Sequence, residues 1–305
     1  ESEHVAVEAQ FAKAPREPTA AEREEHELTH LPYRAWCRHC VRGRGRSEAH
    51  RELHAESQHT VPHVSIDYCF LGQDENKCMP VLVQRDHASR FTFSEVVPVK
   101  GTGHPYCVKQ TVANLNTLGH PKLLLKCDQE PAIVDLRNQT ITAAKNDGVT
   151  ILKEESPVGE SQSNGVVERA IQDVEGLVRT MKDQLEFRYK SKIDSKHHVL
   201  TWLVRHAGFL LSRFQLGADG LTAYERLKGN PFRRKLYHLG GCVHYMPMGK
   251  NFGQRKSLNK LDVRWHDGVF LGLRDSTNEY LIGTAWSSQS LFHQTQSGIR
   301  TVCTG

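Results

Sequence analysis

The segment VSIDY at residues 64–68 decides the fold, because it places an acid in the middle of an apolar, β-rich run. Two more apolar runs follow it, MPVLV at residues 79–83 and FTFSEVV at residues 91–97. Short turns separate the three runs, so the sequence predicts an antiparallel meander of three strands. The acid inside the first strand, Asp67, needs a partner, since a buried unpaired carboxylate is costly.

Helix and strand patterns alternate after this meander. The expected elements are a helix over 105–118, a short buried strand over 122–127, a helix over 132–144, a fifth strand over 149–152 and long helices over 166–189 and 199–214. Three strands followed by alternating helices and strands are typical of an α/β domain, in which helices flank a mixed five-stranded sheet.

The flanking segments differ from this centre in composition. Residues 1–25 hold two prolines, clustered acids and few apolar residues, which predicts a linker or a disordered segment. We assign residues 26–59 to a His/Cys segment with a basic linker, 60–231 to the central α/β domain and 232–305 to a basic linker with a small β-barrel-like module. Short strands expected at 268–273 and 280–282 support the last assignment.

Three acids occupy positions that suit a divalent cation. Asp67 lies within the first strand, Asp128 directly follows the strand over 122–127, and Glu168 lies in the first turn of the helix over 166–189. Two carboxylates on core strands could share a metal ion, which would offset the cost of their burial. Taken singly, each acid also has a structural interpretation, as part of a strand-end turn or as a charge at a helix N-terminus.

Four segments, in order along the chain, resemble a known family. Residues 156–169, SPVGESQSNGVVER, resemble the SP…QxNGxxER segment of copia-type LTR-retrotransposon integrases and, more distantly, the corresponding segment of retroviral integrases. The other matches are DHASR at 86–90, LTAYERLKGNP at 221–231 and GVFLG at 268–272 followed by Tyr280. They are similar to the family's D-x-x-[ST]-R turn, its core-closing [TP]-x-x-E-x-x-x-G-x-P stretch and its downstream G-x-F-L-G…Y module.

The resemblance implies an RNase H-like catalytic core in which Asp67, Asp128 and Glu168 bind two Mg²⁺ or Mn²⁺ ions. The implied reaction is a metal-dependent phosphodiester transesterification. Water first cuts near the 3′ end of the element, and the freed 3′-hydroxyl then attacks target DNA. Asn164 and Arg169, in the most specific of the four segments, are expected to contact DNA.

The chain departs from the family pattern after the fourth expected strand. The family usually has D-[NS]-G-x-E-F there, whereas residues 128–131 read DQEP, which lacks the glycine and adds Glu130. Two alternatives to an active integrase therefore stay open. One is an integrase-derived DNA-binding protein without activity. The other is a structure-selective nuclease on the same fold, which would cleave DNA without joining ends.

A compact His/Cys cluster precedes the central domain. Its candidate zinc ligands are His26, His30, Cys37 and Cys40. The two imidazoles lie one helical turn apart, and the proline at residue 32 should end that helix and turn the thiols back toward them. The cluster resembles the HHCC module that precedes integrase cores, with only six residues between its His and Cys pairs. The alternative is a CxxC turn beside unrelated histidines, of which the chain has 18.

Basic residues flank the central domain, although the net charge of the whole chain is only +5. Residues 34–51 contain six Arg and one Glu, and residues 226–264 contain ten Lys+Arg and one acid. The candidates for DNA contact in these blocks are Arg42, Arg44, Arg46, Arg233, Arg234, Lys235, Arg255, Lys256 and Lys260. A solvated basic surface is the alternative interpretation.

The composition excludes membrane and secreted proteins. No stretch approaches the roughly 18–20 consecutive apolar residues that span a bilayer, and the Glu-rich start has no basic-then-apolar leader. We expect an intracellular, nuclear protein that binds double-stranded DNA, both element ends and target, with no membrane partner. We further expect a homo-oligomer, because joining two DNA ends requires two active sites, and a segment of a longer polyprotein.

Overall fold

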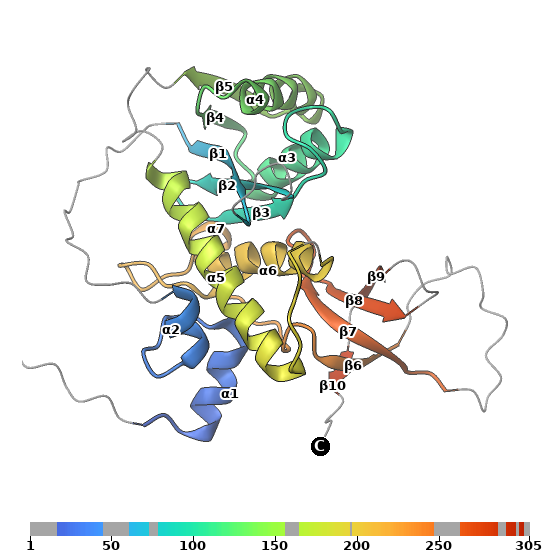
Figure 1. The fold of residues 1–305 in the computed structure, drawn as a ribbon. Coiled ribbons are helices and arrows are strands. Elements are labelled where there is room, and N and C mark those ends of the chain that lie inside the picture. Colours follow the sequence, from blue (N-terminus) through green and yellow to red (C-terminus); the bar gives the residue numbers. More distant parts are fainter. Residues whose placement is uncertain are drawn as a thin grey trace, which may run out of the picture.

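Five strands form the central sheet of the computed structural model, which describes residues 17–44, 61–72, 79–155, 165–195, 197–246, 263–285, 291–296 and 299–301. The strands are β1 (His63–Phe70), β2 (Pro80–Asp86), β3 (Thr92–Val96), β4 (Lys122–Cys127) and β5 (Thr150–Glu155). Their order is β3-β2-β1-β4-β5, with antiparallel pairing from β3 to β1 and parallel pairing from β1 to β5 (Figure 1). This topology confirms the mixed five-stranded sheet of the expected RNase H-like fold.

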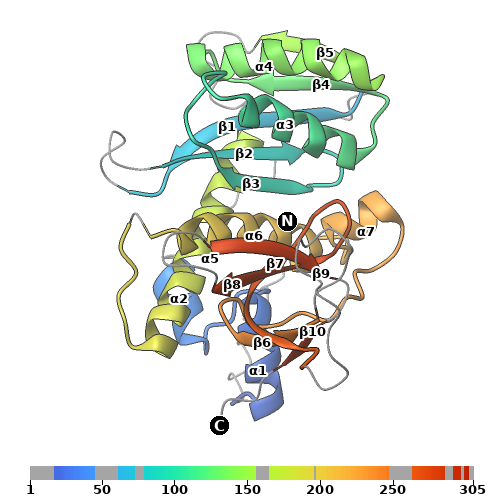
Figure 2. The ribbon, with the colours of Figure 1, turned by 90° about the vertical axis from the view of Figure 1, so that its right-hand side faces the viewer.

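Helices cover both faces of this sheet. Val64, Ile66 and Tyr68 pack with α3 (Pro105–Leu118) and α4 (Pro131–Ala144), whereas Cys69 packs with α5 (Gly165–Tyr189) and α6 (Val199–Phe214). Figures 1 and 2 show α3 and α4 on one face and α5 on the other. Since successive side chains of a strand alternate between faces, Asp67 belongs to the α5 face.

Local chemistry explains where these helices begin and end. Pro105 and Pro131 each occupy the start of a helix, where the missing N–H costs nothing. Helix α3 ends at Gly119, whose φ of 74° suits glycine in a left-handed cap. The short helices η1 (Lys145–Asp147) and α7 (Ala223–Lys228) also end at glycines with positive φ. Among the described helices, none is long and apolar enough to cross a membrane.

Helix α6 lies along the outer edge of β3. The Ser212 hydroxyl accepts a hydrogen bond from Thr92 N (2.8 Å) and donates one to Thr92 O (2.8 Å). The Ser94 hydroxyl donates to Val204 O at 2.6 Å. A Cβ on Gly208 would lie 2.9 Å from Ser94 N, so this close approach requires glycine. Helix α6 thus satisfies the backbone groups of an edge strand that would otherwise be open to pairing.

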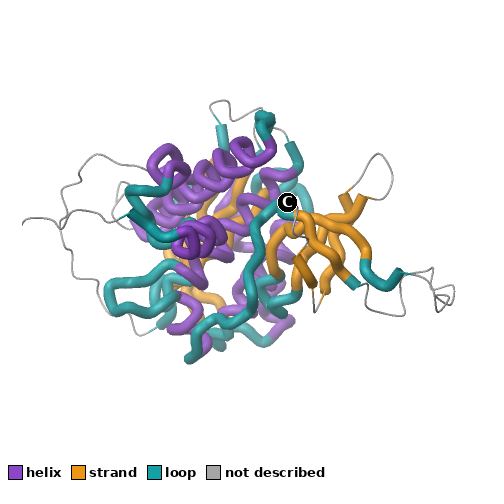
Figure 3. The backbone as a smooth tube through the Cα atoms, turned by 90° about the horizontal axis from the view of Figure 1, so that it is seen from below, coloured by secondary structure: helices purple, strands orange, loops and turns teal. Residues whose placement is uncertain are grey.

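A second five-stranded sheet follows the central domain. It contains β6 (Cys242–Tyr245), β7 (His266–Leu273), β8 (Tyr280–Ala285), β9 (Leu291–Gln296) and β10 (Ile299–Thr301), in the order β10-β6-β7-β8-β9. Seen from below, its strands gather at one side of the helix-rich remainder (Figure 3). The expected strands at 268–273 and 280–282 lie within β7 and β8, which confirms a small C-terminal β-rich module.

A buried arginine fastens this second sheet to the core. The Arg213 guanidinium, at the end of α6, lies 3.0 Å from Asp275 Oδ1 in the turn after β7. It also stacks over the Phe209 ring at 3.9 Å from the ring centroid, and its side chain is 0% exposed. Such a charge is tolerated in an apolar surrounding only because it is paired.

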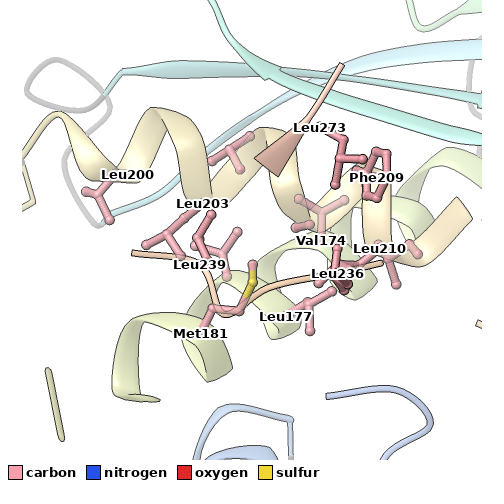
Figure 4. Packing of buried hydrophobic residues seen from close by; sticks show 14 of the residues in the cluster. Val174, Leu177, Met181, Leu200, Leu203, Phe209, Leu210, Leu236, Leu239 and Leu273 are labelled. Carbon is pink, nitrogen blue, oxygen red and sulfur yellow. The ribbon is translucent and has the colours of Figure 1, made fainter. Parts of the chain in front are cut away.

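One apolar cluster joins the parts of the chain beneath the central sheet. Figure 4 shows Leu239, from the connecting segment before β6, between Met181 of α5 and Leu203 of α6. Leu236 of the same segment lies beside Leu177 of α5 and Leu210 of α6. Leu273 of β7 belongs to the same cluster. The second sheet therefore shares its core with the central domain.

Two short helices, α1 (Ala20–Thr29) and α2 (Arg38–Arg44), form the N-terminal part of the described chain. Helix α1 begins inside the range 1–25, for which the sequence predicted a linker or a disordered segment, so that prediction was wrong for residues 20–25. The reason is a capping box: Glu22 N donates to the Thr19 hydroxyl, and Thr19 N donates to the Glu22 carboxylate. Residues 1–16 lie outside the described part of the chain.

We expect Ser212→Ala to destabilise the protein by about 2–4 kcal/mol, because it leaves the buried N–H and C=O of Thr92 without partners. The control is Thr142→Ala, which removes an exposed hydroxyl that bonds only to Asn138 O within α4. Urea unfolding of both variants measures the difference. Equal, small losses in the two would show that α6 does not depend on this contact.

Candidate functional site

The sheet register brings Asp67 and Asp128 to neighbouring strands. Strand β1 pairs in parallel with β4 so that Ser65 lies opposite Lys126. Asp67 and Asp128 each follow two residues further on, so the same register carries both acids to one edge of the sheet. Both side chains are partly exposed. The expected proximity of these two acids therefore follows from strand pairing.

Glu168 joins them from the helix that covers this face. It lies in the first turn of α5 and is exposed to solvent. The pKa of Asp67 is raised to about 6, mainly by burial and also by the nearby negative charges of Asp128, Glu130 and Glu168. A hydrogen bond from Tyr68 N at 2.7 Å opposes this shift. The sheet edge thus concentrates negative charge that the protein does not fully neutralise.

Glu130, the acid that departs from the family pattern, is held in a defined place. Its N–H donates to Asp128 Oδ1 at 3.1 Å, which closes a tight turn without the glycine that the family has there. Its carboxylate lies 2.7 Å from Lys100 Nζ. Lys100 also lies over the Phe70 ring, 4.7 Å from its centroid. No local sequence pattern identifies Lys100, because it lies in a loop 30 residues before its partner Glu130.

The acidic residues are near one another but not converged. In the described part of the chain, the His/Cys cluster is the group of side chains that could hold a metal ion, and its ligand atoms all lie within 4.8 Å of one another. Asp67, Asp128 and Glu168 are not such a group, although they act on one another electrostatically. Their oxygen donors are of the type that Mg²⁺ and Mn²⁺ prefer, and a cation would relieve the repulsion around Asp67.

The four His/Cys residues lie together in the structure. Cys40 Sγ is 3.3 Å from His26 Nε2 and 3.8 Å from His30 Nδ1, while Cys37 Sγ is 3.5 Å from His30 Nδ1. All four side chains are buried. Helix α1 ends at Thr29, His30 takes a left-handed conformation (φ 54°), and the chain turns back to α2, as the proline at residue 32 led us to expect.

These distances match tetrahedral metal coordination. Ligation of zinc by sulfur and nitrogen at ordinary bond lengths places the two ligand atoms about 3.6 Å apart, close to the 3.3–3.8 Å observed. A hydrogen bond from Cys40 lowers the pKa of Cys37, which favours a thiolate in the pair. The cluster could therefore hold a metal ion, and the interpretation as a CxxC turn beside unrelated histidines was wrong. His39 lies outside the cluster and pairs with Asp183 at 2.6 Å.

Two of the basic candidates make contacts within the protein. Arg42 Nη1 lies 2.5 Å from Asp183 Oδ1 on α5, and Arg44 Nη1 donates to His30 O at 3.2 Å. Both side chains help to hold α2 in place. Arg169 lies beside Glu168 on α5, where its Nε is 3.4 Å from Asp173 Oδ1 and its side chain is 59% exposed.

The remaining basic candidates are exposed or lie beyond the described residues. Arg233, Arg234 and Lys235 are exposed in the segment that leads from α7 to β6. Arg234 and Lys235 lie over the rings of Tyr280 and Tyr237, respectively. Arg46, Asn164, Arg255, Lys256 and Lys260 are outside the described part of the chain.

Comparisons with known proteins return retroviral integrases among solved structures. A chain of the simian T-cell lymphotropic virus intasome, in complex with PP2A regulatory subunit B56 gamma, matches at 13% identity and a TM-score of 0.42, with 88% of each chain covered. The HTLV-2 integrase catalytic core domain in complex with magnesium (trimeric form) matches at 13% identity and 0.39, over 54% of this chain and 95% of that chain. The catalytic core domain of BIV integrase matches at 19% and 0.36, over 54% and 92%. No protein-family model and no curated protein matches.

Asp67→Asn should stabilise the protein at pH 7 but not at pH 4. The folded-state pKa of about 6 is raised above the ordinary value of 3.8, so ionisation of Asp67 opposes folding. That penalty is absent below about pH 4, grows as the pH rises through 4–6 and is complete at pH 7, where removing it gains about 1 kcal/mol after solvent screening.

Urea unfolding at both pH values measures this effect. The control is Asp135→Asn, which removes an exposed carboxylate on the neighbouring helix α4. An Asp67→Asn gain that is the same at pH 4 and pH 7 would contradict the electrostatic explanation.

The His/Cys cluster predicts one bound metal ion per chain. Cys37→Ser should lower the zinc content of the purified protein from about one ion per chain to near zero, because a tetrahedral site loses a thiolate ligand. Cys242→Ser, which alters an exposed cysteine on β6, should leave the content unchanged. Elemental analysis of both proteins decides, and zinc retained in Cys37→Ser would rule the site out.

Proposed function

We propose that this protein is an integrase of the copia type, which catalyses metal-dependent 3′-end processing and strand transfer of DNA. The observation that carries the proposal is the placement of Asp67 and Asp128 on neighbouring strands at one sheet edge, near Glu168 of α5, where burial and like charges raise the pKa of Asp67 to about 6. Carboxylates gathered in this way are typical of a site for divalent cations. The NGxxER segment that ends at Arg169 supports the same family.

The protein's own residues fix the orientation of these acids. Tyr68 N holds Oδ1 of Asp67, and Glu130 N holds Oδ1 of Asp128. Lys100 neutralises Glu130, which would otherwise compete for a cation. Glu168 and Arg169 are neighbours on the exposed first turn of α5, so a carboxylate and a cationic guanidinium both face the solvent where a phosphodiester would approach.

Asp67, Asp128 and Glu168 would hold the divalent ions. Two Mg²⁺ or Mn²⁺ ions would activate the attacking oxygen and stabilise the leaving oxygen of an in-line displacement at phosphorus. The pKa of Asp67 means that its carboxylate is protonated below about pH 6, so cation binding should weaken as the pH falls through that value.

Zinc in the His/Cys cluster would have a structural role. All four candidate ligands are protein side chains and all are buried, which leaves no open position for a substrate. The site would tie α1 to α2 at the base of α5.

Double-stranded DNA is the proposed partner, both as element ends and as target. Arg42, Arg169, Arg233, Arg234 and Lys235 are the exposed basic candidates in the described residues, and their contacts with phosphates would weaken as salt rises. The protein would act in the nucleus as a homo-oligomer, because two ends must be joined in one assembly.

DNA binding without catalysis is a second candidate function. Two observations favour it: the three acids do not form a group of metal-ligating side chains as the His/Cys residues do, and Glu130 with its Lys100 partner replaces the family's glycine-containing turn. This candidate needs the fold and the basic surface but not the metal ions.

Strand transfer on a blunt oligonucleotide, with Mg²⁺ or Mn²⁺, separates the two candidates. Asp67→Asn and Glu168→Gln should each lower joining by at least about a hundredfold, since each removes a metal ligand, while DNA binding changes little. Asp135→Asn is the matched control and should join at the wild-type rate. Joining that persists in Asp67→Asn would refute the acidic site, and wild-type protein that binds but never joins or cuts DNA would establish the second candidate.

A further inference from the structure

Helix α2 lies unusually close to α5, the long helix that carries Glu168. A Cβ on Gly43 would lie 2.6 Å from Thr180 N, so only glycine permits this approach. Arg179 Nε donates to Gly43 O at 3.1 Å. The backbones of the two helices are therefore in close contact, although the contacting residues lie more than a hundred positions apart in the sequence.

An ion cluster, in which Asp183 and His39 are largely buried and Arg42 is exposed, reinforces the contact between α2 and α5. Asp183 of α5 binds His39 through Oδ2 (2.6 Å from Nδ1) and Arg42 through Oδ1 (2.5 Å from Nη1), so both of its carboxylate oxygens bind α2. The side chains of Asp183 and His39 are only 15% and 9% exposed. Removing the carboxylate charge would leave two cationic or donor groups of α2 without their partner.

Helix α2 and the residue just before it supply the two cysteines of the His/Cys cluster, Cys40 and Cys37. Cys40 follows His39 directly and lies 3.3 Å from His26 Nε2 of α1. The His30 and His39 rings meet edge to face at 5.9 Å. Helix α2 thus contacts the candidate metal ligands of α1 through Cys40, and Asp183 of α5 through His39 and Arg42.

We propose that Asp183 is a positioning residue for the His/Cys metal site, and that metal binding there stabilises α5. A metal ion would link α2 to α1 through the His/Cys ligands, and Asp183 links α2 to α5 through His39 and Arg42. The metal ion and Asp183 therefore both fix the position of α2. Linkage then requires reciprocity: whatever the metal contributes to α5, the contacts from α5 contribute to metal affinity. Glu168 lies some fifteen residues earlier on α5, so metal in the His/Cys cluster would also affect the placement of Glu168. A role of Glu168 as a metal ligand rests on the proposed function, whereas the coupling between the His/Cys site and α5 does not.

Metal affinity tests the first half of the proposal. Competition with a chromophoric chelator on the full chain should show that Asp183→Asn raises the dissociation constant for Zn²⁺ by about tenfold or more, the usual effect of losing a residue that supports metal ligands. The matched control is Lys182→Gln, which removes the charge next to Asp183 on α5. The Lys182 ammonium pairs with Glu186 of the same helix and not with α2. The control should stay within about twofold of wild type. Wild-type affinity in Asp183→Asn would overturn the proposal.

Hydrogen exchange of the wild-type chain tests the second half and needs no variant to fold. Removing zinc with a chelator should speed amide exchange over residues 176–187 of α5 as well as over α1 and α2. Faster exchange confined to α1 and α2 would overturn the coupling. Neither measurement involves DNA or Mg²⁺, so a chain that fails to join DNA can still show the coupling, and the reverse also holds.

Discussion

Helix α5 has to bury one apolar stripe along its whole length, and the rest of the structure is arranged to meet that requirement. Val167 and Val174 pack toward the central sheet, whereas Met181 and Leu185 lie beyond it. An isolated sheet could cover only the first part of a 25-residue helix. The connecting segment before β6 and the N-terminal helices cover the remainder, which explains why flanking segments pack as closely as core elements.

The same helix links the two candidate metal sites. Its first turn presents Glu168 to the sheet edge, and its later turns carry Asp183 and Thr180 against α2. The two sites differ in their electrostatics. The acidic edge is open to solvent and carries excess negative charge, whereas the His/Cys cluster is closed and contains soft donors. Each set of donors suits a different metal, oxygen for Mg²⁺ and sulfur with nitrogen for Zn²⁺.

Local patterns predicted the elements of the fold well. The helices expected at 105–118 and 199–214 match α3 and α6 at both ends, because apolar spacing is a local signal. Helix α3 also has a leading proline and a following glycine. The His/Cys cluster was also predictable, since its four residues lie within fifteen positions. Helix α1 began earlier than expected, because the capping box at Thr19 lay within a segment whose composition is typical of linkers.

Contacts between distant residues could not be predicted in this way. Lys100 beside Glu130 and His39 beside Asp183 are pairs of ordinary charged residues, and nothing in either sequence neighbourhood identifies the partner. Arg213 gave no signal either, because an arginine in the last turn of an amphipathic helix is usually solvated. Pairings of this kind decide which basic side chains remain exposed to solvent and which form contacts within the protein.

The burial of Arg213 bears on where this protein can be divided. The sequence suggested a boundary at residue 231, but a fragment that stopped there would lose Asp275, the partner of a fully buried guanidinium. It would also uncover the faces of α5 and α6 that Leu236 and Leu239 protect. The segment over 60–231 that the sequence suggested as a domain is therefore not the whole unit of folding, which extends through β7.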